Sequence, residues 1–188
     1  MSEEFLGDRR KALEEEFFAK HNQQLLQQLR QTTTAGTQKE ALAAASGITD
    51  AAVLEQLAAL GLTSETLAAM SLVPLVEVAW ADGSLDAKEQ SALLTAAEQA
   101  GLNKNGASYR LLEEWLRERP SSNLLETWKA YVAVLSNTLN EQAKQALKQE
   151  LLERARLVAE AAGGFLGLGK RISSAEQAVL TELEQAFA

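Results

Sequence analysis

LAAMSLVPLVEVAWA, residues 67–81, is the most apolar window of the chain, and the rest of the fold has to cover it. The window is too short to span a bilayer and contains Pro74 and Glu77, so it predicts a buried helix. We expect a short helical segment over 64–70, followed by a second helix capped by Ser71. Pro74 then lies in the first turn of that second helix, where its missing N–H does no harm.

The composition predicts an all-α protein built around one compact core. Ala, Leu, Glu and Gln dominate the 188 residues, only two prolines occur, and aromatic residues make up 5% of the chain. These residues favour helix over strand almost everywhere. A chain of this length is large enough to bury one core. We therefore expect a multi-helix bundle.

Apolar stripes, capping residues and glycines divide the rest of the chain into further helices. Gly47 and Gly61 each close a short helix, and Pro120 marks the clearest break. QTTTAGT at 31–37 predicts a hinge, because it has little apolar content and contains a glycine. The predicted helices span about 8–31, 38–46, 50–60, 86–100, 107–119, 123–138, 141–162 and 174–187. The predicted parts are an N-terminal amphipathic helix and hinge (1–37), two short helices packing on the core (38–62) and a main helical domain (63–188).

Two sets of side chains are predicted to belong to the core. The helix at 141–162 carries a regular apolar face, and most of the large aromatic side chains continue apolar stripes. The face consists of Ala143, Leu147, Leu151, Ala155, Val158 and Ala162, and the aromatic set consists of Trp80, Tyr109, Trp115, Trp128 and Tyr131.

Charge and cysteine content exclude several classes of function. A formal charge of −8 and a pI near 4.8 argue against binding of nucleic acid, which needs clustered Lys and Arg. The acidic N-terminus, MSEEFLGDRRKALEEEFF, does not resemble a secretion signal, so we expect a cytoplasmic protein without a membrane span. The absence of cysteine excludes zinc–thiolate and cysteine-nucleophile chemistry.

Two features that suggest an enzyme do not meet the requirements of one. GFLGLGKR at 164–171 approaches a phosphate-binding loop, but Arg171 replaces the magnesium-binding hydroxyl and a helical sequence precedes it where a strand is required. His21 is the only histidine and has no evident catalytic partner. We therefore predict a protein that is not an enzyme and requires no cofactor.

A short pattern occurs twice, as LDAKEQSALL at 85–94 and ISSAEQAVLT at 172–181. Asp86 and Ser173 each have N-cap character, and Glu89 and Glu176 follow three residues later. This spacing is that of a capping box, in which the cap and the glutamate bond each other's backbone N–H groups. Two helix starts built in the same way are one complete explanation of the repeat.

Capping does not account for the Asp-Gly that precedes the first copy. Asp82, Gly83, Asp86 and Glu89 follow the second half of a calcium loop, in which glycine makes the sharp turn. The first half is absent, so an EF-hand is rejected. Asp82, Asp86 and Glu89 remain candidate ligands for a divalent ion of the calcium or magnesium type.

At this loop the chain resembles the tellurite-resistance TerB-like family, a group of helical domains. The matching stretches are VAWADGSLDAKEQSALLTAAEQAGL at 78–102 and GGFLGLGKRISSAEQAVLTELEQAF at 163–187, and the resemblance covers about 63–187. It implies a compact bundle of the TerB-like type and a bacterial, cytoplasmic role as a scaffold or sensor in a stress response. It also implies a divalent-cation site at Asp82, Asp86, Glu89 and Glu176.

The second stretch departs from the family pattern at the positions that would bind the ion. Gly169 and Lys170 stand where Asp82 and Gly83 stand in the first stretch. If the two loops meet, Lys170 or Arg171 would replace the cation with an internal salt bridge. The sequence leaves this alternative open beside the metal site.

Residues 1–62 lie outside that resemblance. FLGDRRKALEEEFFAKHNQQLL at 5–26 and GITDAAVLEQLAALGL at 47–62 are faintly similar to the zeta-type inhibitor of bacterial rotary ATP synthases. The second functional hypothesis is therefore an adaptor or inhibitor that binds a protein partner through Phe17, Phe18 and Leu25 on the first helix. The alternative prediction is that the same helix packs onto the bundle.

Overall fold

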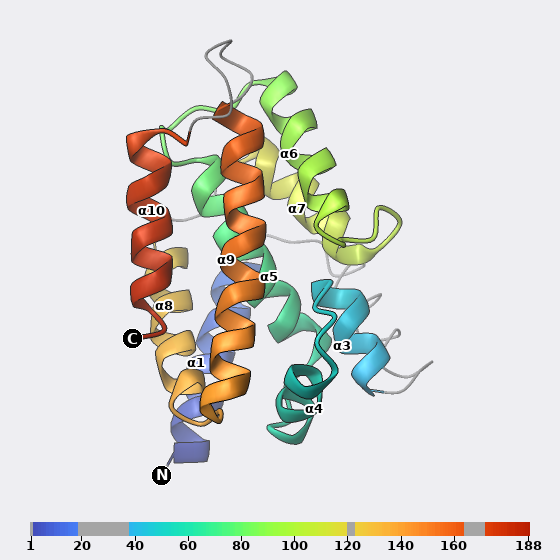
Figure 1. Cartoon of the computed structure of the whole chain (residues 1–188), viewed down its shortest axis with the longest axis vertical. Helices are drawn as coiled ribbons and strands as arrows, with labels where there is room; N and C mark the ends of the chain where they lie inside the picture. Colours follow the sequence, from blue (N-terminus) through green and yellow to red (C-terminus); the bar gives the residue numbers. More distant parts are fainter. Residues whose placement is uncertain (1, 19–37, 120–122, 164–171) are drawn as a thin grey trace.

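The computed structural model describes residues 2–18, 38–119, 123–163 and 172–188, and the described chain is helical without strands. This confirms the predicted all-α fold (Figure 1). The helices are α1 (Ser2–Phe18), α3 (Gln38–Ser46), α4 (Ala51–Ala59), α5 (Ser64–Ala79), α6 (Ala87–Gln99), α7 (Ala107–Arg117), α8 (Leu124–Ser136), α9 (Glu141–Gly163) and α10 (Ser174–Gln185). None of them is long and apolar enough to cross a membrane.

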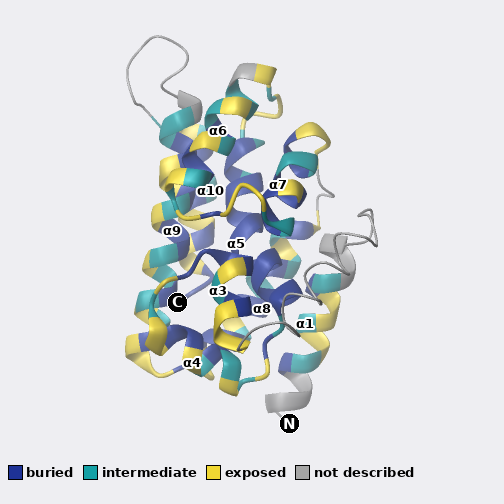
Figure 2. Cartoon of the chain, turned by 90° about the vertical axis from the view of Figure 1, so that its right-hand side faces the viewer, coloured by how far each residue is buried: buried dark blue, intermediate teal, exposed yellow. Residues whose placement is uncertain are grey.

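The central element is α5, which contains most of the window 67–81. Every residue of α5 except Glu77 is buried. Figure 2 shows this helix in the middle of the molecule, with α9 on one side and α1 on the opposite side. The helices α3, α7, α8 and α10 also pack against it. A helix that is apolar on all faces needs such a complete cover, because any open face would expose it to water.

The predicted break before Ser71 is wrong, because one helix runs continuously from Ser64 to Ala79 with Pro74 inside it. An internal proline removes the N–H that would bond the carbonyl four residues earlier, here that of Met70. The indole Nε1 of Trp128 on α8 donates to this carbonyl at 3.0 Å. A tertiary contact therefore replaces the missing helical hydrogen bond, and Thr63 caps the whole helix by accepting from the Thr66 N–H.

The two predicted core sets are largely confirmed. The α9 face is buried from Ala143 to Val158, whereas the side chain of Ala162 lies outside the described residues. Tyr109, Trp115, Trp128 and Tyr131 are buried, and Trp80 is half-buried against the same core.

The short helices α3 and α4 are attached to α9 through Arg154. Its guanidinium donates to the carbonyls of Ser46, at 2.5 Å, and of Gly47, which lie at the end of α3. Glu150, one turn earlier on α9, accepts from the backbone N–H of Asp50 at 3.1 Å. Buried carbonyls at a helix end need such donors, and Arg154 supplies them here.

One side of α1 also faces the bundle. Leu6 and Leu13 are buried in the core, and Arg10 donates to the carbonyl of Gly61 at 2.8 Å. Glu14 accepts hydrogen bonds from the hydroxyls of Thr63, at 3.3 Å, and Thr66. One continuous apolar core thus includes residues from α1, α3, α4 and the main domain. The hinge at 31–37, His21 and the glycine-rich stretch at 164–171 lie outside the described residues.

Candidate functional site

The loop after α5 makes a tight turn around the Asp-Gly pair. The backbone N–H of Gly83 donates to the Trp80 carbonyl at 2.9 Å, and the N–H of Ser84 donates to Oδ1 of Asp82 at 3.0 Å. Gly83 has a φ of +89°, a backbone conformation that residues with a Cβ rarely adopt. The glycine is therefore required by the turn itself, whether or not an ion is bound.

Asp86 and Glu89 form the predicted capping box at the start of α6. The N–H of Glu89 donates to Oδ1 of Asp86 at 2.9 Å, and the N–H of Asp86 donates to Oε2 of Glu89 at 2.8 Å. Both carboxylates thus satisfy backbone donors that have no partner within the helix. The capping prediction for the first copy of the repeat is confirmed.

The second copy has the same geometry at the start of α10. The N–H of Glu176 donates to Oγ of Ser173 at 3.1 Å, and the N–H of Ser173 donates to Oε2 of Glu176 at 2.6 Å. Glu176 is buried, whereas Asp82 and Asp86 are exposed. The carboxylate that the resemblance assigns to the cation site is thus bound to its own helix start.

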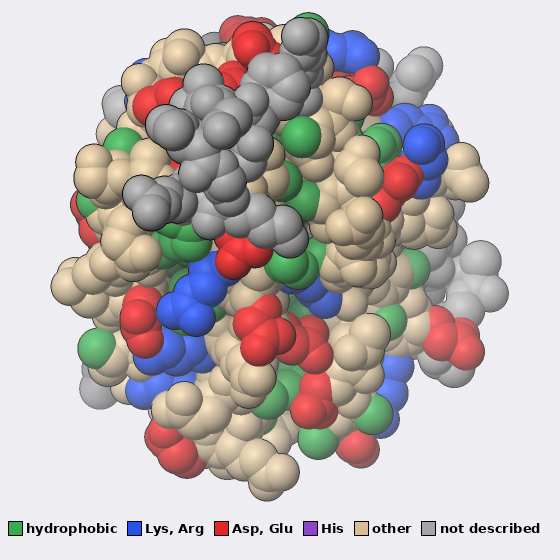
Figure 3. Space-filling view, turned by 45° about the horizontal axis from the view of Figure 1, so that its top comes forward, with side chains coloured by type: hydrophobic (Ala, Val, Ile, Leu, Met, Phe, Trp, Pro, Cys, Tyr) green, Lys and Arg blue, Asp and Glu red, His purple; other side chains and the backbone are tan. Residues whose placement is uncertain are grey.

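The described residues contain no group of three or more His, Asp or Glu side chains arranged as metal ligands. A basic side chain lies beside the loop instead, since a Cβ built on Gly83 would be 3.7 Å from Nη1 of Arg119. Lys170 and Arg171, which the sequence offered as replacements for the ion, lie outside the described residues. Figure 3 shows acidic and basic side chains interspersed on the face of the molecule seen there. Cation binding at Asp82, Asp86, Glu89 and Glu176 stays a prediction.

The predicted partner-binding residues cannot be placed in a common surface. Phe17 and Phe18 end α1, but their side chains, like all of Leu25, are outside the described residues. The preceding turns of α1 are packed inward through Leu6 and Leu13.

Glu77 is the one residue of α5 that is only partly buried, and it is an acid in an apolar helix. Burial raises its pKa from 4.5 to about 7; the positive charge of Arg119 opposes this rise, and the carboxylate of Glu182 on α10 adds to it. Perturbed carboxyls of this kind occur at functional sites and also within structural charge clusters. Trp80, one turn further along, donates from Nε1 to the Trp115 carbonyl at 3.0 Å and so joins α5 to α7 next to this acid.

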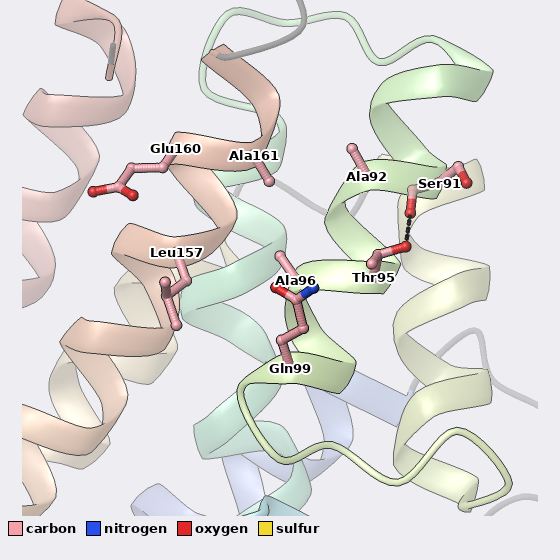
Figure 4. Close-up of a pocket in the computed structure, with 8 residues that line it drawn as sticks. All are labelled: Ser91, Ala92, Thr95, Ala96, Gln99, Leu157, Glu160 and Ala161. Atoms are coloured by element: carbon pink, nitrogen blue, oxygen red, sulfur yellow. Dashed lines mark hydrogen bonds between the residues drawn. The ribbon is translucent and has the colours of Figure 1, made fainter. Parts of the chain in front are cut away.

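A groove between α6 and α9 is a concave feature that the sequence analysis missed. It encloses about 520 Å³, and Figure 4 shows its residues on the two facing helices. Alanine side chains lie between the helices and polar side chains lie along α6, whereas Leu157 and Glu160 come from α9, with the Glu160 side chain directed away from α6. The α6–α9 groove is lined by Ser91, Ala92, Thr95, Ala96, Gln99, Leu157, Glu160 and Ala161.

Leu157 is 45% exposed, and no other large hydrophobic side chain is exposed among the described residues. It lies outside the buried face of α9, with polar neighbours Arg156 and Glu160. The sequence could have indicated this exposure, because a leucine that lies off the apolar stripe of its helix does not face the core. A single exposed leucine is common, but one at the edge of a groove marks a candidate contact surface.

Comparison of the chain with protein-family models, with curated proteins and with solved structures gave no match. The site therefore has to be interpreted from its own residues.

Proposed function

We propose that this chain is a non-enzymatic helical scaffold of the TerB-like type that holds a protein partner in the α6–α9 groove. The observation that carries the proposal is Leu157, the exposed large hydrophobic side chain of the described residues, at the edge of a hollow of about 520 Å³. An apolar side chain beside a preformed groove gains stability when a partner removes it from water.

The lining favours a protein segment over a small molecule. Sites for small molecules combine apolar and aromatic walls with a few converging polar groups. The described residues of its lining are three alanines, Leu157 and four polar side chains, without an aromatic side chain among them. Grooves between two helices commonly accept the apolar face of a third helix.

The sensor version of the TerB-like hypothesis adds a divalent ion at Asp82, Asp86, Glu89 and Glu176. The hydrogen bonds of the last three explain them as helix caps. We therefore propose the scaffold role without a bound ion and treat ion binding as a separate test. The cytoplasmic, stress-response setting is part of the proposal and rests on the N-terminal sequence and on the family resemblance.

An adaptor or inhibitor acting through Phe17, Phe18 and Leu25 is the alternative. The described turns of the same helix give it no support, because Leu6 and Leu13 are in the core. The α6–α9 groove is our preferred contact surface for this reason.

Affinity capture with matched variants tests the proposal. Ala92→Leu fills the groove with only a small loss of helix propensity, and Ala133→Leu makes the same change at an exposed position on α8. A specific partner should bind the wild type and Ala133→Leu and be lost with Ala92→Leu, while circular dichroism shows all three chains folded. The captured protein is then purified and the three affinities are measured directly. Equal binding to all three chains would exclude the groove as the contact surface.

A further inference from the structure

We propose that the chain binds one buried water molecule where the central helix α5 meets the end of α3 and the middle of α9. The water lies in a cavity of about 10 Å³, whose lining includes Ser46 on α3, Ser71 on α5 and Arg154 on α9. This site is separate from the α6–α9 groove and does not depend on the proposed function. Three observations support it, namely an unpaired hydroxyl, the size of the cavity and the polar groups around it.

The hydroxyl of Ser71 is the first observation. Ser71 is 3% exposed, and its Oγ has no hydrogen-bond partner among the described residues. A serine within a helix can donate to the carbonyl four residues earlier, as Ser46 does to Leu42 at 2.8 Å. Ser71 makes no such bond to Leu67. Because buried polar groups are almost always bonded to protein or to ordered water, this hydroxyl requires a partner.

The cavity beside Ser71 is the second observation, and its size fits a water molecule. A volume of about 10 Å³ is close to the smallest that holds one water, so an organic ligand is too large for it. A metal cation is disfavoured because the guanidinium of Arg154 lines the same space. The apolar part of the lining consists of Leu72, Leu75, Ala97, Ala100 and Leu102.

Two further polar side chains of the lining can bond the same water. Oγ of Ser46 donates to a carbonyl of its own helix and accepts from the N–H of Ile48 at 3.0 Å, which leaves one acceptor lone pair. Arg154 donates to two carbonyls at the end of α3 and to Glu150 at 3.5 Å, and a guanidinium has more N–H groups than these bonds use. Buried waters typically make about three hydrogen bonds, which these side chains can supply together with Ser71.

Such a water would join three segments that are far apart in the sequence. Ser46 ends α3, Ser71 lies within α5, and Arg154 lies on α9. Its hydrogen bonds would add to the contacts by which Arg154 attaches the end of α3 to α9. Removing the Ser71 hydroxyl should therefore weaken the fold, although that hydroxyl contacts no polar group of the described chain.

The test combines a crystal structure with two matched variants of the full chain. The crystal structure shows whether a water lies within hydrogen-bond distance of Oγ of Ser71. Relaxation dispersion of the water oxygen counts long-lived waters in solution and does not detect exchanging hydroxyl protons. The variants are Ser71→Ala and Ser108→Ala. Ser108 is also buried, but its hydroxyl donates to the Ala45 carbonyl, so its removal breaks a bond within the protein.

We expect a water peak that contacts Ser71 and at least one of Ser46 and Arg154. The dispersion amplitude of Ser71→Ala should be lower than that of the wild type by the contribution of about one water molecule, whereas Ser108→Ala should keep the full amplitude. Urea unfolding should show that Ser71→Ala raises the equilibrium constant for unfolding by about threefold or more, because the variant leaves the remaining polar groups short of a partner.

Three outcomes would overturn the inference. One is electron density without a water at Ser71, whether its hydroxyl then bonds a protein atom or nothing. Another is an equal loss of dispersion amplitude in both variants, which would mean that serine removal loosens the whole chain. The third is a Ser71→Ala variant that is as stable as the wild type or more stable, since removing a hydroxyl that has no partner does not destabilise a protein.

Discussion

Trp128 donates a hydrogen bond of 3.0 Å from its indole Nε1 to the carbonyl of Met70, the group that Pro74 leaves without a donor in its own helix. Both residues are fully buried, and 58 positions separate them along the chain. The central helix therefore tolerates an internal proline because a neighbouring helix supplies the missing donor. An unpaired carbonyl at this depth would cost about 1–3 kcal/mol.

The first prediction is that Trp128 and Pro74 are energetically coupled. Trp128→Phe should destabilise the chain by about 2–4 kcal/mol, because it leaves the Met70 carbonyl unpaired and opens a small cavity. Adding Pro74→Ala should recover about 1 kcal/mol or more of that loss, because the introduced alanine provides the helical N–H. Urea unfolding of the wild type, both single variants and the double variant measures the coupling. Strict additivity would show that the hydrogen bond contributes nothing.

The second prediction concerns Glu77, whose pKa burial raises from 4.5 to about 7. The folded carboxyl keeps its proton to higher pH than the unfolded one, so the folded state binds more protons between about pH 4.5 and pH 7. This group therefore lowers stability as the pH rises through that window. Glu77→Gln should be about 1–3 kcal/mol more stable than the wild type at pH 8 and nearly equal to it at pH 4.5. Urea unfolding at both pH values measures the difference, and a pH-independent difference would contradict the prediction.

The third prediction separates helix capping from ion binding. Asp86→Ala and Ser173→Ala should each lower the free energy of unfolding by about 1 kcal/mol, and by the same amount with and without millimolar calcium or magnesium. Asp82→Asn combined with Glu89→Gln removes charge but keeps oxygen acceptors, so it should cost little and leave any response to ions unchanged. Thermal unfolding followed by tryptophan fluorescence measures both. A native-state ion at a hundredfold excess over its Kd would add about 2.7 kcal/mol to the wild type. Such a gain, absent from the double variant, would establish the cation site and reject the ion-free scaffold.

The fourth prediction tests whether α1 belongs to the core. Leu13 is fully buried, so Leu13→Ala should destabilise the chain by about 2–5 kcal/mol. Leu157→Ala makes the same chemical change at a side chain that is 45% exposed and should cost less than about 1 kcal/mol. Chemical unfolding of both variants gives the comparison. A negligible cost at Leu13 would mean that α1 is not held on the bundle, and it would favour the partner-binding role of Phe17, Phe18 and Leu25.

Much of the local structure could be predicted from the sequence. The start of α6 at Asp86 and the start of α10 at Ser173 follow from capping boxes, which are formed by residues three positions apart. Gly47 and Gly61, with φ values of +72° and +70°, end helices where the sequence placed their ends. The periodic face of α9 identified the side chains that it buries. Signals of this kind act within one or two turns of helix, and the fold preserves them.

The candidate site was much less predictable. The sequence identified Asp86, Glu89 and Glu176 as capping residues, but whether they and Asp82 converge on one point depends on how two loops lie in space. The α6–α9 groove arises only when Ala92 and Ala96 face Ala161, and 65 positions separate Ala96 from Ala161 along the chain. Leu157 lay off the apolar stripe, but the sequence did not show that a groove would lie beside it.

The sequence by itself determined that the chain is all-helical, where most helices begin and end, and which faces they bury, because caps, glycines and apolar periodicity are local properties. Only the tertiary structure decided that α5 continues through Pro74, that the pKa of Glu77 rises, and that Leu157 borders an open groove. Each of these depends on groups far apart in the chain, since a donor, a desolvating surface or a facing helix has to be brought to the residue by the fold.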